Sequence, residues 1–245
     1  MIKEALQYII SLQQKRVENI DGKDYYFDDG RPYLVDKCHK CETMQLSTLT
    51  SLVEYIKRKL DAKVAGENSL ERMIIHVVSE SEVRLISELN GDMRRYDIIS
   101  VKARLPKITL NEWMEQEKFV IQMQSMFTEN EDSKLVLKVA GNVEDRSVAK
   151  YSDDGMTQKA TIKSGLTNVE DVIVPNPVTL NPFRTFFEIG SIETPFVFRL
   201  RNGGAGVNCA LFEADGGMWK QQAVHEIAEY LTCQLADVDN IVILS

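Results

Sequence analysis

The stretch that decides the fold is residues 73–104, MIIHVVSESEVRLISELNGDMRRYDIISVKAR. Three parts of it have the β-branched, apolar composition typical of strands, namely 73–79, 82–89 and 96–104. Asn90 and Gly91 stand between the last two, and both tolerate the positive φ of a tight turn. The sequence therefore predicts an antiparallel meander. His76 lies inside the first strand, where an isolated histidine is more typical of a hydrogen-bonded core residue than of a base.

Helices are predicted before and after the meander from apolar residues at helical spacing. The first helix would carry Ile2, Ala5, Leu6, Ile9 and Ile10. The second follows Ser47 or Thr48, either of which can cap it, and carries Leu49, Leu52, Val53, Ile56 and Leu60. Thr109 and Glu112 have the form of a capping box before a third helix with Trp113, Val120, Met123 and Phe127. The last helix, 218–235, has the stripe Trp219, Ala223, Ile227, Leu231 and Leu235.

The rest of the chain is predicted to be mostly strand. Two short strands should surround Asp29 and Gly30, and 241–244 should return to the sheet. Other strands, separated by Gly, Pro, Asn or Asp, are predicted at 135–139, 147–151, 157–163, 169–174, 183–189, 196–201 and 207–212. This order indicates an α+β fold, a largely antiparallel sheet packed with about four helices.

One domain covering residues 1–245 fits this length. If there are two lobes, the boundary should lie near 128–133, where Asn130, Glu131 and Asp132 form a turn cluster. Strands such as 169–174 and 196–198 need more cover than the few predicted helices provide, so we expect a homo-oligomer.

The composition excludes some classes of partner. With 29 basic and 37 acidic residues the formal net charge is -8, which repels a phosphate backbone and disfavours duplex nucleic acid. No apolar run approaches the ~20 residues of a membrane-spanning helix, and the first residues lack the apolar stretch of a secretion signal. Four cysteines without framework spacing are typical of a reducing compartment. We therefore expect a cytoplasmic protein without a membrane partner.

Six segments spread over most of the chain have a distinctive sequence, namely 48–57 (TLTSLVEYIK), 75–89 (IHVVSESEVRLISEL), 124–143 (QSMFTENEDSKLVLKVAGNV), 151–165 (YSDDGMTQKATIKSG), 174–187 (VPNPVTLNPFRTFF) and 210–220 (ALFEADGGMWK). Together these segments resemble an uncharacterised phage and prophage protein family, the YfdQ-like proteins, whose function is unknown. The resemblance implies an origin in a phage or prophage and expression in the cytoplasm of a bacterial host. It supplies no catalytic motif.

The most site-like stretch surrounds the start of the last helix. Glu213, Asp215 and His225 bracket it, and Gly216 and Gly217 allow close approach of a ligand to the backbone. A metal ion or a phosphate could bind there. The alternative is structural and is favoured, because Asp before a helix is typical of an N-terminal cap and Gly-Gly of a strand-to-helix turn.

Cys38, His39 and Cys41 form a C-H-K-C motif that could supply half of a tetrahedral zinc site. The second pair of ligands is missing from the sequence pattern, so an incidental surface turn is favoured over a metal site. We expect no cofactor.

The sequence favours a non-catalytic phage or prophage accessory protein that self-associates and binds a host or phage component. That component would be a protein or a small nucleotide, and one purpose of such binding would be to counter a host defence. Because catalytic groups assemble in space rather than in sequence, enzymatic activity stays open. The alternative is a metal-assisted enzyme acting on nucleotides or nucleic acid through Glu213, Asp215 and His225.

Overall fold

A computed structural model describes residues 3, 16–28, 31–34, 42–60, 72–89, 93–143, 157–164, 168–204 and 206–245. The chain forms two compact units, residues 1–42 and 43–245, and each is described by itself. The predicted helix at 2–10, the strand at 147–151 and the turn residues Asn90 and Gly91 lie outside the described residues, apart from residue 3. The fold is α+β, as the sequence predicts, and its described part contains four helices.

The first unit is a three-stranded antiparallel sheet in the order β1-β2-β3. Its strands are β1 (Arg16–Ile20), β2 (Lys23–Asp28) and β3 (Arg31–Leu34). Tyr26 and Tyr33 face each other across β2 and β3, and their rings stack with centroids 5.1 Å apart. The predicted pair of strands around residues 29 and 30 is confirmed, whereas β1 was not predicted.

The meander forms the middle of a five-stranded sheet in the order β15-β5-β6-β7-β4. The prediction is confirmed: β5 (Met73–Ser79), β6 (Glu82–Ser87) and β7 (Asp97–Lys102) pair antiparallel. The edge strands are parallel to their neighbours, β4 (Met44–Leu46) to β7 and β15 (Ile241–Leu244) to β5. The predicted return of 241–244 to the sheet is also confirmed.

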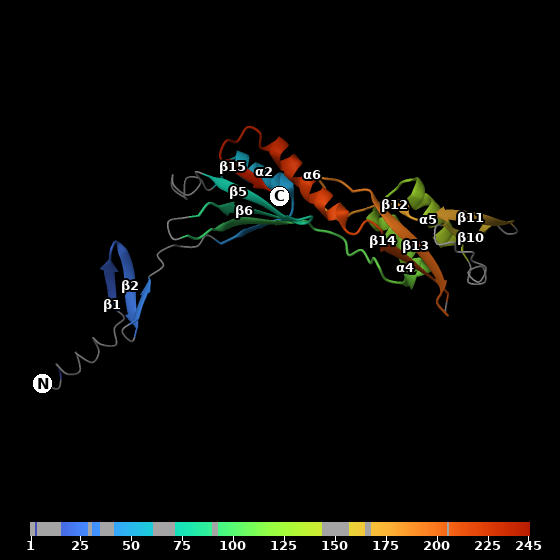
Figure 1. Cartoon of the computed structure of the whole chain (residues 1–245), viewed down its shortest axis with the longest axis horizontal. Coiled ribbons are helices and arrows are strands. Elements are labelled where there is room, and N and C mark those ends of the chain that lie inside the picture. Colours follow the sequence, from blue (N-terminus) through green and yellow to red (C-terminus); the bar gives the residue numbers. More distant parts are fainter. Residues whose placement is uncertain are drawn as a thin grey trace. The chain divides into compact units, whose positions relative to one another are not determined.

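Two helices cover one face of this sheet, α2 (Leu49–Lys57) and α6 (Met218–Gln234), as Figure 1 shows. Thr48 is the cap of α2, since its side chain accepts a hydrogen bond from the N–H of Ser51. All five residues of the predicted α6 stripe are buried. The prediction that Leu60 belongs to the apolar stripe of this helix is wrong, because α2 ends before Leu60 and its side chain is 48% exposed.

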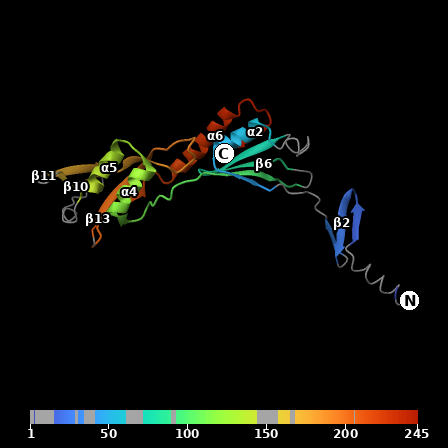
Figure 2. The ribbon, with the colours of Figure 1, turned by 180° about the vertical axis from the view of Figure 1, so that it is seen from behind.

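A second five-stranded sheet has the order β8-β14-β13-β12-β9. Its strands are β8 (Met114–Glu115), β14 (Val207–Glu213), β13 (Thr194–Asn202), β12 (Val178–Pro182) and β9 (Phe127–Thr128). The helices α4 (Gln116–Met126) and α5 (Glu131–Asn142) pack on it over a second apolar core (Figure 2). A separate antiparallel pair consists of β10 (Thr157–Ser164) and β11 (Asn168–Pro175). The strands predicted at 157–163, 169–174, 196–201 and 207–212 are thereby confirmed.

The expected capping box at Thr109 is wrong, because the third predicted helix begins later, at Gln116. Thr109 is instead held by Gln122, whose Oε1 accepts the Thr109 N–H at 2.7 Å and whose Nε2 donates to the Thr109 carbonyl at 3.1 Å. Trp113 consequently precedes the helix and Phe127 follows it. Tertiary hydrogen bonding here replaces the local cap that the motif suggested.

Residues 135–139 were expected as a strand, but they form the middle of α5. Asn130 decides this, because its side chain accepts the N–H of Ser133 while the Ser133 hydroxyl accepts the N–H of Asn130. This reciprocal capping satisfies backbone groups that a helix start leaves without partners. The segment 128–133 therefore links β9 to α5 within the second unit.

Three further expectations are corrected. Residues 183–189 form a loop between β12 and β13 instead of a strand. His76 points to the face of the sheet opposite α2 and α6 and is exposed, whereas its neighbours Ile75 and Val77 are buried. The strands at 169–174 and 196–198 do have cover, since Val174 and Phe196 are fully buried in the second core.

No helix in the described part of the chain is long and apolar enough to cross a membrane.

Candidate functional site

The stretch singled out in the sequence, 213–217, lies beside a buried arginine that the sequence analysis missed. Arg184 follows β12, and its side chain is only 9% exposed. Its Nη1 donates to Glu213 Oε1 at 2.6 Å and its Nη2 donates to Thr194 Oγ1 at 2.6 Å. A planar guanidinium can satisfy two such acceptors from one position, which a lysine cannot do. Arg184 therefore links the loop after β12 to the ends of β13 and β14.

Trp219 in the first turn of α6 completes this cluster. The Arg184 Cζ lies 3.7 Å from the centroid of the Trp219 ring and 5.4 Å from that of Phe196. The indole Nε1 of Trp219 also donates to Glu213 Oε1, at 3.1 Å. Stacking of a guanidinium on an aromatic face is favourable where water is excluded. Glu213 thus accepts hydrogen bonds from both members of the stack.

Burial lowers the pKa of Arg184 to about 10, although Glu213 and then Asp215 favour its charged form. At neutral pH the side chain is therefore still a cation. A buried cation needs a counter-charge and hydrogen-bond acceptors, and Glu213 provides both. The arrangement holds α6 against the second sheet and gives the Glu213 carboxylate a structural task.

Asp215 caps α6, as the favoured interpretation of the sequence has it. Its Oδ1 accepts the N–H of Gly217 at 3.0 Å and its Oδ2 accepts the N–H of Trp219 at 3.0 Å. Gly216 and Gly217 have φ of 64° and 86°, a backbone conformation that residues other than glycine rarely adopt. The two glycines therefore make the turn that brings Asp215 under the first free N–H groups of the helix.

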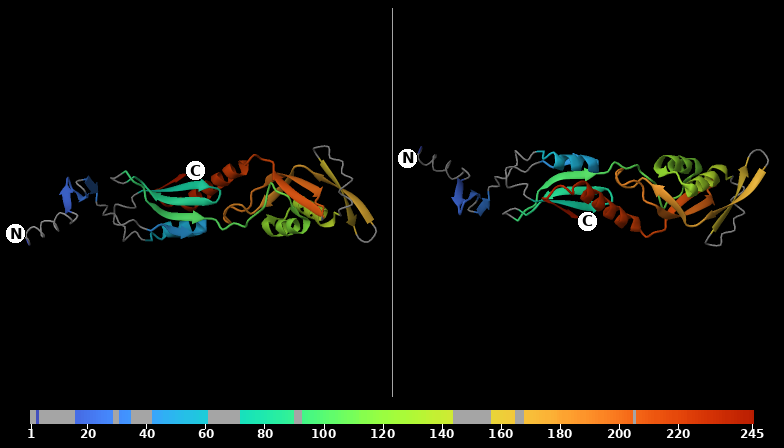
Figure 3. Two further views of the ribbon diagram at one scale, coloured as in Figure 1. Left: turned by 90° about the horizontal axis from the view of Figure 1, so that it is seen from below. Right: turned by 90° about the horizontal axis from the view of Figure 1, so that it is seen from above.

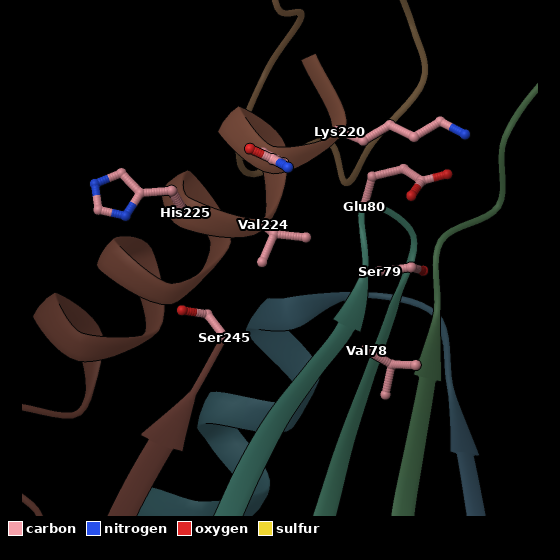
Figure 4. A pocket seen from close by; sticks show the side chains of 8 residues that line it. Val78, Ser79, Glu80, Lys220, Val224, His225 and Ser245 are labelled. Carbon is pink, nitrogen blue, oxygen red and sulfur yellow. The ribbon is translucent and has the colours of Figure 1, made fainter. Parts of the chain in front are cut away.

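His225 lies elsewhere, on the exposed side of α6, where its Nε2 is 3.1 Å from Glu229 Oε1. It lines an open hollow of about 450 Å³ with Val78, Ser79, Glu80, Lys220, Gln221, Val224 and Ser245. Figure 4 shows that the side chains of His225 and Lys220 point to different sides of the hollow. They do not converge on one point, as the groups of a catalytic site must.

The metal-assisted alternative gains no support from these positions. Glu213, Asp215 and His225 are all described by the structure. The described residues contain no group of three or more His, Cys, Asp or Glu that could hold a metal ion. Cys38, His39 and Cys41 lie outside the described residues.

A surface that the sequence analysis missed is the second face of the sheet β15-β5-β6-β7-β4. In the view from below in Figure 3 its strands have no helix in front of them, whereas α6 crosses them in the view from above. Three apolar side chains on this face are exposed, Val78 by 41%, Val242 by 40% and Leu244 by 49%. Because all four residues of 241–244 are apolar, their sequence has no alternation that could have indicated which face the helices leave uncovered.

The charged groups of this face lie on β6 and β7. Arg84 Nη2 is 2.7 Å from Glu82 Oε1, and Lys102 Nζ is 3.7 Å from Glu82 Oε2. Arg84 also approaches Asp97, at 3.9 Å. The face thus joins an apolar half on β15 and β5 to a half on β6 and β7 that carries both signs of charge.

Comparison with protein-family models, with curated proteins and with solved structures finds no match to this chain.

Proposed function

We propose that the chain is a non-catalytic accessory protein of phage or prophage origin that self-associates and binds a host or phage component. The observation that carries the self-association is strand β15 at the edge of its sheet. Its sequence, Ile241, Val242, Ile243 and Leu244, is entirely apolar and strongly β-forming. Within the part of the chain that the structure describes, β15 pairs on one side only, with β5.

Edge strands of soluble proteins usually carry a lysine, a proline or a bulge that prevents pairing with another chain. β15 has none of these, because its four residues are uncharged and its pairing with β5 is regular. An unprotected apolar edge is a liability unless a partner covers it. The partner we propose is β15 of a second copy.

Antiparallel pairing of two β15 strands about a two-fold axis would join the two sheets into one. Each strand would supply backbone donors and acceptors to the other, and the interface would be the same on both chains. Val242 and Leu244 of one copy would then lie beside those of the other on the uncovered face, where both side chains are exposed in the single chain. Burial of these apolar side chains would add to the backbone hydrogen bonds.

The expectation that strands 169–174 and 196–198 lack cover no longer supports self-association, since Val174 and Phe196 are buried. The phage origin and the work in the cytoplasm of a bacterial host rest on the sequence resemblance. The non-catalytic part of the proposal is supported by the cluster around Arg184, where the carboxylates of Glu213 and Asp215 have structural partners.

Static light scattering over a concentration series tests the self-association. The wild type should have the mass of at least two chains, and Val242→Lys with Leu244→Lys should return it to one chain by placing charge on the edge. Ile121→Lys is the matched control, because Ile121 on α4 is 56% exposed and lies away from β15. A single-chain mass of the wild type at its highest soluble concentration would refute the proposal.

Infection of bacteria that express the protein tests the accessory role. We expect the wild type to change phage plating efficiency or the frequency of lysogeny, and the double lysine variant to lose this effect at equal expression. A variant that scatters as one chain and yet keeps the full effect would show that self-association is dispensable.

A further inference from the structure

A second pocket, distinct from the hollow beside His225, lies next to the loop after β12. It has a volume of about 310 Å³ and is more enclosed than that hollow. Its lining residues are Leu105, Pro106, Thr128, Phe183, Thr185, Phe187, Gly190 and Ser191. They come from three separate segments of the chain, of which the loop 183–191 contributes most.

The loop is firmly anchored on both sides of Phe187. Phe186 is 1% exposed and belongs to the core under α2 and α6, against which Ile189 also packs. Thr50, in the first turn of α2, donates two hydrogen bonds to Glu188 Oε1, one from its N–H at 2.9 Å and one from its hydroxyl at 3.1 Å. Thr185 Oγ1 donates to the carbonyl of Glu80 at 2.7 Å. The backbone of the loop is thereby fixed by core packing and by hydrogen bonds.

Phe187, in contrast, is 77% exposed although both its neighbours have partners. Its ring centroid is 6.0 Å from that of Phe183, so two phenyl rings stand at the pocket. Burial of a phenylalanine side chain in a complex has a favourable free energy, because it removes apolar surface from water. A fold that holds such a ring rigidly in water leaves this free energy available for binding a partner.

The lining determines which chemistry the pocket accepts. None of its eight residues is charged, so no ionised group would find a counter-charge there. Thr128 and Ser191 hydroxyls lie 3.0 Å apart, and each oxygen has lone pairs to offer a donor. The volume is at the lower end of the ~300–1,000 Å³ range of small-molecule pockets, which suits one ring system.

We propose that this pocket binds an aromatic side chain of a partner protein, presented on an uncharged, extended segment, with Phe187 packed beside it. Phe187 lines the pocket and is still largely exposed, so it offers apolar surface that one seated side chain would not cover, which favours a polypeptide as the occupant. Aromatic side chains seated in such pockets dominate the free energy of many protein interfaces. The inference names a class of partner for the proposed binding function and is independent of the pairing through β15.

Isothermal titration of the full chain with N-acetyl-tryptophanamide tests the pocket. We expect saturable binding to the wild type and no binding of N-acetyl-lysinamide. Phe187→Ala should weaken the binding at least about fivefold, and Ser191→Leu, which fills the pocket, should abolish it. Met218→Ala is the matched control, because Met218 is 72% exposed outside the pocket and its loss should leave binding unchanged.

Selection of peptides from a random library on immobilised full chain tests the partner class. Enriched peptides should share one aromatic residue with uncharged flanks, and Phe187→Ala should remove the enrichment. Unchanged binding by Phe187→Ala, or tighter binding of adenosine than of N-acetyl-tryptophanamide, would overturn the inference. Light scattering of the same samples keeps this outcome separate from failure of the β15 interface.

Discussion

Arg184 and Trp219 are joined through one oxygen atom: the guanidinium stacks on the indole at 3.7 Å, and both groups donate to Oε1 of Glu213. Glu213 and Trp219 are six positions apart at the end of β14 and the start of α6, whereas Arg184 comes from a loop 29 positions before Glu213. Because Arg184 is 9% exposed, its charge depends on this one carboxylate more than a surface arginine would.

Removing the charge of Glu213 should therefore destabilise the fold. We expect Glu213→Gln to lower the free energy of unfolding by about 2 kcal/mol, because Arg184 keeps an acceptor but loses its counter-charge. Urea denaturation at pH 7 measures this. Glu229→Gln is the control, since Glu229 is exposed and pairs with His225 on the surface of α6, so the change in the free energy of unfolding should be close to zero.

The cap of α6 gives a second prediction. Asp215→Ala should cost about 1 kcal/mol, because the N–H groups of Gly217 and Trp219 lose their acceptor. Asp215→Asn should cost less, since its one remaining oxygen can still accept from the backbone. Thermal unfolding of both variants checks the order. Loss of phage-related activity in a fully folded Asp215→Asn protein would contradict the capping role and favour chemistry by the carboxylate.

Gln122 is buried and holds the backbone of Thr109 at both its N–H and its carbonyl. Replacement by methionine preserves the length of the side chain but removes both hydrogen bonds. We expect a loss of roughly 2 kcal/mol in the free energy of unfolding, because two partly buried backbone groups of Thr109 would be left without these partners. Chemical denaturation is the measurement, and Gln124→Met on the exposed side of α4 should be neutral.

The two cysteines of the second unit should differ in reactivity. Burial raises the pKa of Cys209 to about 12, so at pH 8 only about one in ten thousand of these thiols is ionised, whereas Cys233 is exposed. In a Cys38→Ser, Cys41→Ser background a disulfide reagent should label one thiol rapidly, and two in denaturant. Rapid labelling of both in the folded protein would show that Cys209 is accessible.

The same background tests the C-H-K-C motif. If Cys38 and Cys41 hold no obligatory metal, the double serine variant should melt at the wild-type temperature, because half a ligand set cannot supply the folding free energy of structural zinc. Stoichiometric zinc in the wild type, lost together with stability in the variant, would contradict this expectation. Elemental analysis of both purified proteins provides the control.

The sequence predicts those elements whose pattern is strictly local. The stripe of α6 and the strands of the meander follow the periods of helix and strand, and the structure confirms both. Residues 135–139 mislead because Leu135, Val136 and Val139 suit a strand by composition. The capping of α5 by Asn130 decides the outcome instead, and it then places Val136 and Val139 on one buried face.

The candidate site was predictable only in part, for a related reason. Asp215 and the two glycines act within a few residues of one another, so their role is legible along the chain. The partnership of Arg184 with Glu213 spans 29 positions and arises only when β13 and β14 pair. The loop 183–189 is similar, because its aromatic residues divide between a core and the solvent for reasons of tertiary packing.

The parallel pairing of β15 with β5 has a consequence for how the protein is made. Both strands belong to one sheet, yet the whole second sheet is synthesised between them. A nascent chain can form the meander early, but its β5 edge stays open and its core stays without the cover of α6 until α6 and β15 have left the ribosome. Such long-range closure is slow, and the waiting intermediate exposes apolar surface. We therefore expect the first sheet to need protection by a chaperone during translation, whereas the second sheet can close while synthesis continues.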